Sequence, residues 1–287
     1  MFIKRYLNFI LLLGITLIIN GCTAPMPWPE SPLYDFSKYD NEKTSVSNID
    51  SIKKQLVGHY AHYDVVSYED STTQSPMFTF VISYGFTDLY LDSVGDLIQS
   101  HTFLRASHKI NQKNITSEFS DKAVQAIKPQ NHKVELSLKD GKWNIVRPPT
   151  PSLLGITGDP SKPLSKDRND PNLTDPDGDG KPGVTVKITI AKFIKGEIYI
   201  TRREIFTHYL TLNNDGTLIG FVKDDSEQFV VGSSLSILDQ PSNNFQHPSK
   251  GMNPILLVPI SPEINTLEKL MEIRDDIFPK EPDFFER

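Results

Sequence analysis

Apolar and polar residues alternate along much of the chain beyond residue 57, which is the pattern of half-buried β-strands. The alternation is clearest in the segments 78–86, 134–138 and 184–190, and it resumes at 198–200. Asp140-Gly141 and Asn214-Asp215-Gly216 are strong hairpin signals between such segments, and Lys195-Gly196 predicts another turn. The chain is therefore predicted to fold mainly as strands joined by short turns.

Three segments carry helix signals instead. Residues 49–56 predict a short helix, and Ser120 is placed to cap a second helix over residues 120–127. Ser261-Pro262-Glu263 combines an N-cap, a proline at the first helical position and an acidic first turn. It predicts the start of a C-terminal α-helix, which Pro279 ends. No regular alternation of strands and helices is present, which argues against a parallel α/β fold.

The pattern favours one mainly β domain over residues 51–287, an antiparallel β-barrel or sandwich interrupted by a long loop rich in Pro, Asp and Gly. Residues 229–231 and 235–237 predict a further strand, and a bend is expected at Gly85. The aromatic stripe between Phe78 and Phe86 is expected to pack as core rather than to line a ligand cavity.

The first residues have the features of an export signal. The apolar run 9–19 follows two basic residues and is too short for a membrane span of about 20 residues. Ile19-Asn20-Gly21-Cys22 resembles the lipobox of bacterial lipoproteins, from which Asn20 departs. The resemblance implies a signal peptide over residues 1–21 and acylation of Cys22, which anchors the protein to a membrane. Because Thr23 rather than Asp follows Cys22, the resemblance also implies that the protein is located at the outer membrane of the bacterial cell envelope.

Residues 22–50 contain four prolines followed by a polar stretch, and they predict a flexible tether between the lipid and the domain. Cys22 is the one cysteine of the sequence, so an intramolecular disulfide is excluded.

The long loop ends in the one motif that carries chemistry, Asp175-Pro176-Asp177-Gly178-Asp179-Gly180. Carboxylates at every second position can curl around one hard cation, and calcium takes about six to eight oxygen ligands. Asp175, Asp177 and Asp179 are therefore predicted to bind calcium together with the backbone carbonyl of Lys181. The calcium loop is expected within residues 167–183.

This motif is similar to the calcium loops of thrombospondin type 3 and dockerin repeats, here as a single copy. It is not an EF-hand, because Val186 stands where that loop has its last carboxylate and a strand rather than a helix is expected to follow. A further ligand is expected from Asp170, with Asp167 and Glu197 as alternatives. The calcium affinity is expected in the weak extracellular range, with a Kd of about 10⁻⁴–10⁻³ M.

Residues 177–186 and 196–200 are also similar to a string in uncharacterised bacterial lipoproteins with a lipocalin-like β-barrel. The resemblance implies a fold and a compartment, and it implies no activity.

The histidines predict no catalytic site. His62 and Asp64 share one strand face, with His59 on the other, and are expected to be exposed polar residues. The other histidines have no ligand spacing, and the sequence contains no nucleophile-elbow, zinc-protease or phosphate-loop motif. We therefore assign no catalytic residue and no organic cofactor.

A formal charge of −6 argues against nucleic acid as a partner, because phosphates attract basic surfaces. The sequence favours an envelope lipoprotein whose calcium-stabilised domain binds an apolar small molecule, a lipid or another envelope protein. One alternative is a structural or adhesive lipoprotein without a ligand cavity. The other is a hydrolase that uses His62 and Asp64.

Overall fold

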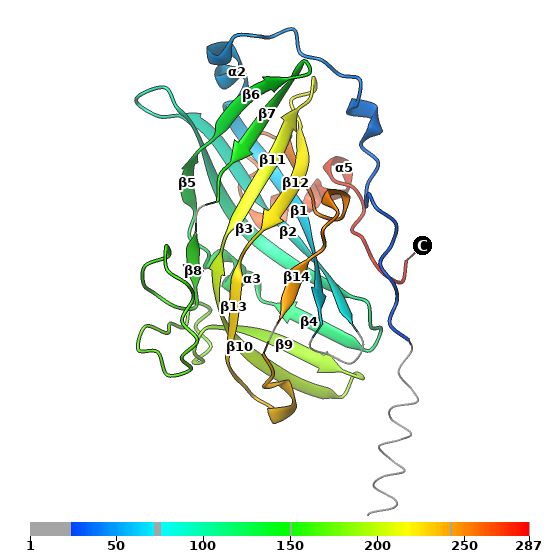
Figure 1. Ribbon diagram of the computed structural model, residues 1–287, viewed down its shortest axis with the longest axis vertical. Helices are drawn as coiled ribbons and strands as arrows, with labels where there is room; N and C mark the ends of the chain where they lie inside the picture. Colours follow the sequence, from blue (N-terminus) through cyan, green and yellow to red (C-terminus); the bar gives the residue numbers. More distant parts are fainter. Residues whose placement is uncertain (1–23, 72–75, 150, 242, 287) are drawn as a thin grey trace, which may run out of the picture.

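The computed structural model describes residues 24–71, 76–149, 151–241 and 243–286. Strands make up 45% of the residues and helices 12%, which confirms the predicted mainly β class. The strands form a nearly closed antiparallel β-barrel that is long and narrow (Figure 1). The predicted signal peptide and Cys22 lie outside the described residues.

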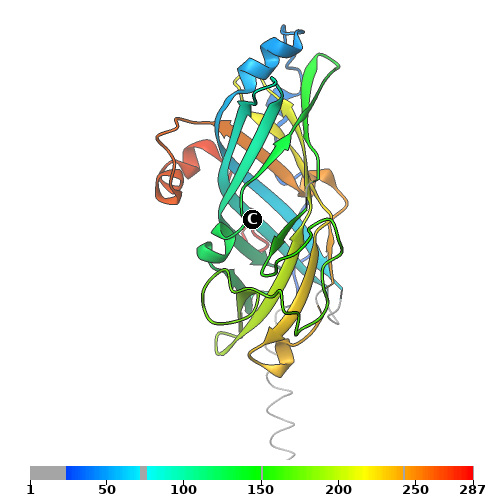
Figure 2. The same cartoon turned by 90° about the vertical axis from the view of Figure 1, so that its left-hand side faces the viewer.

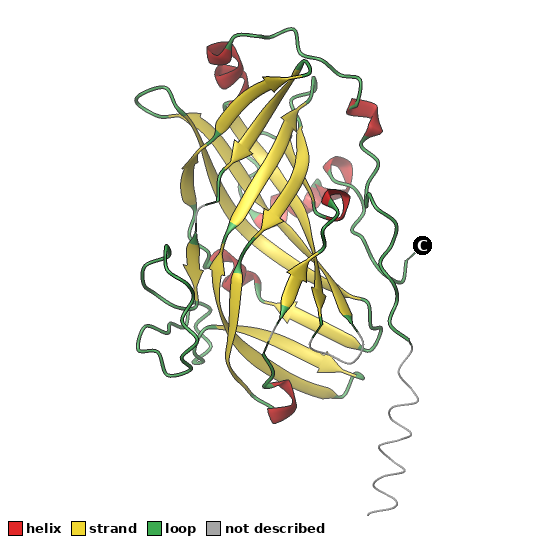
Figure 3. Cartoon of the chain, in the orientation of Figure 1, coloured by secondary structure: helices red, strands yellow, loops and turns green. Residues whose placement is uncertain are grey.

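A large sheet forms most of the barrel wall, in the order β5-β3-β2-β1-β15-β12-β11-β7-β6 with β14 beside β1. Its strands are β1 (Gly58–Asp70), β2 (Met77–Leu91), β3 (Leu97–Ile110), β5 (Gln130–Lys133), β6 (Glu135–Lys139), β7 (Lys142–Arg147), β11 (Phe206–Leu212), β12 (Leu218–Asp224), β14 (Asn244–Gln246) and β15 (Pro254–Pro259). A smaller sheet completes the lower part of the wall in Figure 3, in the order β13-β10-β9-β4 with β8 beside β10. Its strands are β4 (Ile115–Phe119), β8 (Ser152–Leu154), β9 (Val184–Ile190), β10 (Ile194–Glu204) and β13 (Glu227–Ser233).

The helices are short and lie at the ends and on the outside of the barrel (Figures 1 and 2). They are η1 (Ser37–Tyr39), α2 (Ile49–Leu56), α3 (Asp121–Gln125), η2 (Ser236–Leu238), η3 (Lys250–Met252), α4 (Leu267–Glu272) and α5 (Arg274–Ile277). In the part of the chain that the structure describes, none of them has the length and apolar character needed to cross a bilayer.

A packed core closes the barrel beneath α2, at the upper end in Figure 1. Asn48 caps this helix by accepting hydrogen bonds from the first backbone N–H groups, so the helix begins where the sequence predicts. Ile52 and Leu56 on its inner face are fully buried against strand residues such as Ile145 and Leu257. This end of the barrel therefore has a filled interior.

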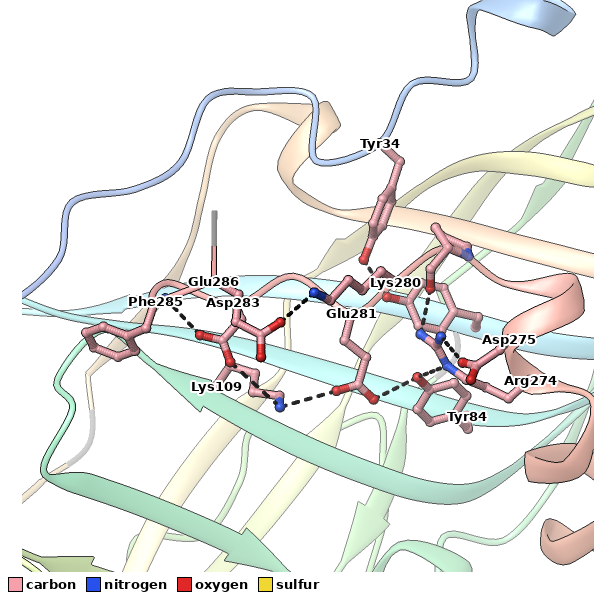
Figure 4. A network of polar contacts seen from close by, with 12 residues as sticks. Tyr34, Tyr84, Lys109, Arg274, Asp275, Lys280, Glu281, Asp283, Phe285 and Glu286 are labelled. Carbon is pink, nitrogen blue, oxygen red and sulfur yellow. Dashed lines mark hydrogen bonds and ion pairs between the residues drawn. The ribbon is translucent and has the colours of Figure 1, made fainter.

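The C-terminal segment covers the outer face of β1 and β2. The ring of Phe284 stacks on Phe80 with centroids 4.3 Å apart. Figure 4 shows the polar contacts beside this packing, where Tyr84 Oη donates to Glu281 at 2.8 Å and accepts from Arg274 Nε at 3.0 Å. The aromatic stripe of β2 is thus core, as predicted.

Residues 24–48, within the predicted tether, run along the outside of the barrel. The ring of Trp28 stacks on Phe78 with centroids 4.5 Å apart. The backbone N–H of Met26 donates to the carbonyl of Asn111, and Asn111 Nδ2 donates to the carbonyl of Met26, both at 2.9 Å. These bonds fix the beginning of the described chain beside the β3–β4 turn.

Several local predictions are confirmed. Asp140-Gly141 joins β6 to β7, and Asn214-Asp215-Gly216 joins β11 to β12. The pairing of β2 with β3 shifts register between Tyr84 and Gly85, where the bend was expected. Ser120 caps α3 by accepting from the N–H of Ala123.

Three local predictions are wrong. The chain turns at residues 191–193, whereas Gly196 lies inside β10. A Cβ there would come within 2.6 Å of Leu238 Cδ1, so the close approach of η2 explains this glycine better than a turn. Residues 235–237 fall largely in η2 rather than in a strand, and the C-terminal helix starts after Thr266 instead of Ser261.

Candidate functional site

The lower half of the barrel encloses a cavity of about 390 Å³. Inward-facing residues of β1, β2 and β3 form one wall, and residues of β4, β9 and β10 form the other. Most of the lining is apolar, as the side chains of Val66, Val81, Ile188 and Ile200 illustrate. Both the volume and the apolar walls are those of small-molecule sites in proteins.

The alternation of strand residues explains which side chains reach this cavity. In β2, Met77, Thr79, Val81 and Ser83 line it, while the aromatic residues between them face the outer core. The aromatic face of β2 is easy to recognise in the sequence. The small and polar residues between the aromatic ones indicate only weakly that the other face lines a cavity.

The cavity reaches the surface beside η2. Ile237 lines it and is nevertheless 67% exposed. Gln240 and Pro241, a few residues further along, also line it and are exposed. The cavity is therefore open at the end of the barrel opposite α2.

A pair of opposite charges lies on the cavity wall. Arg202 Nε donates to Glu204 Oε1 at 2.6 Å, Arg202 Nη2 donates to Glu204 Oε2 at 3.2 Å, and Arg202 Nη1 donates to Gln228 Oε1 at 2.8 Å. Burial alone would lower the pKa of Arg202, but the carboxylate of Glu204 raises it above its ordinary value. The guanidinium is thus charged and already neutralised by its neighbour.

Tyr68 and Asp224 form a second, half-buried pair next to the first. Tyr68 Oη donates to the carboxylate of Asp224, which also accepts from the N–H of Ser226 at 2.7 Å. Burial raises the pKa of Asp224 and that of Tyr68. The tyrosine therefore stays protonated at neutral pH and satisfies its partner.

His108 faces the same cavity. Burial, and to a lesser extent the charge of Arg202, lowers the pKa of His108 to about 4. Its Nδ1 lies 2.8 Å from Ser117 Oγ. At neutral pH the imidazole is uncharged, so the described lining offers no free positive charge.

Three histidines form a polar layer between the cavity and the filled upper core. The ring of His62 lies 4.1 Å from that of His101 and 5.8 Å from that of His208. Burial holds the pKa values of His101 and His208 well below the usual range. The histidines come from β1, β3 and β11, so no sequence spacing could have indicated their meeting.

The expectation that His62 and Asp64 are exposed is wrong. They are 0% and 4% exposed, because both faces of β1 are covered, and His62 Nε2 lies 2.5 Å from Asp64 Oδ2. His62 Nδ1 lies 3.2 Å from Thr87 Oγ1, which places a hydroxyl, an imidazole and a carboxylate in a row. Thr87 is also 0% exposed, so its hydroxyl and the imidazole of His62 are both buried, whereas Asp64 lines the cavity.

The predicted calcium loop brings its three carboxylates together, each offering an oxygen within 4.8 Å of the others. Asp177 is only 7% exposed; its Oδ2 accepts from the N–H of Thr185, whereas its Oδ1 is buried with no partner. Burial raises the pKa of Asp177, and a backbone N–H from Gly180 lowers that of Asp175. An orphaned buried carboxylate oxygen beside two further carboxylates fits a hard cation.

The other predicted calcium ligands lie outside the group of three carboxylates. Lys181 donates its N–H to Asp179 Oδ1 at 2.9 Å, which keeps its backbone in the loop. The carboxylate of Asp170 accepts from the N–H and the side-chain amide of Asn172. Among the described residues, the group of three carboxylates includes neither Asp170 nor Asp167 nor Glu197.

Comparisons with protein-family models, with curated proteins and with solved structures give no match to this chain.

Proposed function

We propose that the protein is a binding module that holds an uncharged apolar molecule in the barrel cavity. The observation that carries the proposal is a cavity of about 390 Å³ with mainly apolar walls, which opens beside η2. A barrel with a filled interior would favour the structural or adhesive alternative. Here the part beneath α2 is filled, and the part below it holds the cavity.

The charge pattern supports an uncharged ligand. Arg202 is the one arginine of the described lining, which contains no lysine, and Glu204 already binds it through two hydrogen bonds. Asp64 and Asp70 add carboxylates to the same lining. A fatty-acid carboxylate would therefore lose its hydration without gaining a cation, which is costly. An alcohol or an ester avoids that loss.

Fluorescence of N-phenyl-1-naphthylamine, an uncharged apolar probe, tests the proposal. We expect the wild-type emission to rise on binding and hexadecanol to displace the probe. Ala106→Trp places a ring in the cavity and should abolish the rise, whereas Val94→Trp changes an exposed turn and should leave it intact. Equal probe binding by both variants would contradict the cavity as the site.

We also infer that calcium stabilises the loop at residues 175–181. The unpartnered Oδ1 of Asp177 supports this inference. Asp175, Asp177 and Asp179 would hold the ion with the carbonyl of Lys181, and the ion would neutralise three carboxylates that otherwise repel one another. Isothermal titration of the metal-free protein with calcium measures this binding, and an absence of heat at millimolar calcium would contradict it.

The membrane anchor and the outer-membrane location remain part of the proposal and rest on the lipobox-like residues ending in Cys22. Labelling of cells with an alkyne fatty acid should mark the wild-type protein and leave Cys22→Ala unmarked. Fractionation of the envelope then identifies the membrane that holds the labelled protein.

A further inference from the structure

The open end of the barrel carries exposed apolar side chains. Phe193, in the β9–β10 turn, and Ile237, in η2, are each 67% exposed. Both elements lie at the lower end of the molecule in the two perpendicular views of Figures 1 and 2. Ile237 lines the cavity mouth, and Phe193 lies in the turn before β10, the strand against which Leu238 of η2 packs. Exposed apolar side chains grouped beside a cavity mark an interaction surface.

Basic residues lie next to these apolar side chains. Lys192 and Lys195 flank Phe193 and are exposed. The N–H of Ala191 donates to the carbonyl of Asn114 at 2.7 Å, so the β3–β4 turn with exposed Lys113 lies beside the β9–β10 turn. Three lysines at one end of a chain with a formal charge of −6 favour an anionic partner.

The beginning of the described chain lies at this same end. The two hydrogen bonds between Met26 and Asn111 hold it beside the β3–β4 turn. Cys22 precedes Met26 by four residues, which span at most about 14 Å when fully extended. A lipid attached to Cys22 would therefore enter a bilayer close to Phe193 and the cavity mouth.

We propose that this end of the barrel docks on the surface of an anionic lipid bilayer, with Phe193 and Ile237 among the head groups. The cavity mouth beside Ile237 then faces the lipid, so an apolar ligand passes between bilayer and cavity without crossing water. The docking proposal rests on the proposed ligand binding and extends it, because it identifies the bilayer as the source and destination of the ligand. Combined apolar and basic contacts of this kind favour membrane interfaces.

The test uses a chain that begins at Ala24, because every described element lies within residues 24–286 and no acyl group then contributes. The chain is sedimented with vesicles of phosphatidylglycerol and phosphatidylethanolamine. We expect binding that falls at least about tenfold in the double variant Phe193→Ser, Ile237→Ser. The matched control is Val94→Ser, because Val94 is 79% exposed at the opposite end and should not contribute. Lys192→Glu with Lys195→Glu should weaken binding and reduce its dependence on salt.

The same samples are assayed with N-phenyl-1-naphthylamine in the absence of vesicles. Probe binding retained by the double variant shows that the fold and the cavity survive, so its loss of vesicle binding supports the docking surface. The docking proposal is overturned if the wild type binds the probe but not the vesicles. It is also overturned if Val94→Ser weakens vesicle binding as much as the double variant does. In either case the proposed ligand binding stands. Vesicle binding without probe binding would instead contradict the proposed ligand function.

Discussion

Arg202 and Glu204 face the cavity from alternate positions of β10 and are joined by two hydrogen bonds of 2.6 and 3.2 Å. We predict that Glu204→Gln frees the guanidinium to bind a carboxylate. Affinity for palmitate should rise about tenfold or more, because a hydrogen bond to a charged group contributes about 1.5–3 kcal/mol. Displacement of N-phenyl-1-naphthylamine by palmitate and by hexadecanol measures the change.

Glu197→Gln is the matched control for this exchange, since Glu197 lies on the same strand but outside the cavity lining. Palmitate that binds the wild type as tightly as hexadecanol would contradict the preference for an uncharged ligand.

The buried histidines predict loss of stability in weak acid. Burial lowers the pKa of His108 and that of His132 to about 4, and it holds those of His101 and His208 well below 6.5. Histidines in the unfolded chain bind protons more readily than these buried ones. The contribution of the neutral buried histidines to the free energy of unfolding is therefore fully present above pH 6.5 and is lost as the pH falls from 6.5 toward 4. Each histidine that is neutral when folded and protonated when unfolded makes the free energy of unfolding fall as the pH falls, by at most about one proton's linkage per group.

Urea unfolding between about pH 7 and pH 5 measures this slope. His108→Gln should make the slope shallower, because one proton fewer is taken up on unfolding. A free energy of unfolding that stays constant between these pH values would be incompatible with neutral buried imidazoles.

Removal of calcium with EGTA should lower the melting temperature. Calcium at ten times its Kd stabilises the folded state by about 1.4 kcal/mol, which corresponds to about 3–6 °C for a domain of this size. Asp177→Asn should abolish the EGTA effect, whereas Asp159→Asn, in the same long loop but outside the group of carboxylates, should retain it. If EGTA still lowers the melting temperature of Asp177→Asn, this loop is not the calcium site.

Phe80 and Val81 are neighbours in β2 that face different sides of the barrel wall. Phe80→Ala should lower the free energy of unfolding by about 3–5 kcal/mol, because its ring is fully buried in the outer core. The same change should leave the Kd for the apolar probe nearly unchanged. Val81→Ala borders the cavity and should alter the Kd while costing less stability. The reverse pattern would mean that the faces of β2 are misassigned.

The sequence predicted those features that depend on neighbouring residues. The strand alternation, the hairpin at Asp140-Gly141 and the cap at Ser120 are set within a few residues of each other, and the structure confirms them. The meeting of His62 with His101 and His208 depends on strand pairing across the whole sheet, which no local pattern encodes.

The wrong predictions have the same physical cause. Gly196 has the residue type of a turn, but it lies inside β10, where the side chain of Leu238 in η2 packs against it. His62 and Asp64 have the composition of a solvent-facing strand, yet the C-terminal segment covers the outer face of β1 while the barrel encloses the inner one. In both cases a contact from a distant part of the chain determined the outcome.

The packed core beneath α2 blocks the upper end of the barrel, and the cavity opens at the opposite end beside η2. If the cavity holds a ligand as proposed, that ligand would not pass through the barrel from one end to the other. An acceptor for the ligand would then be expected at the η2 end.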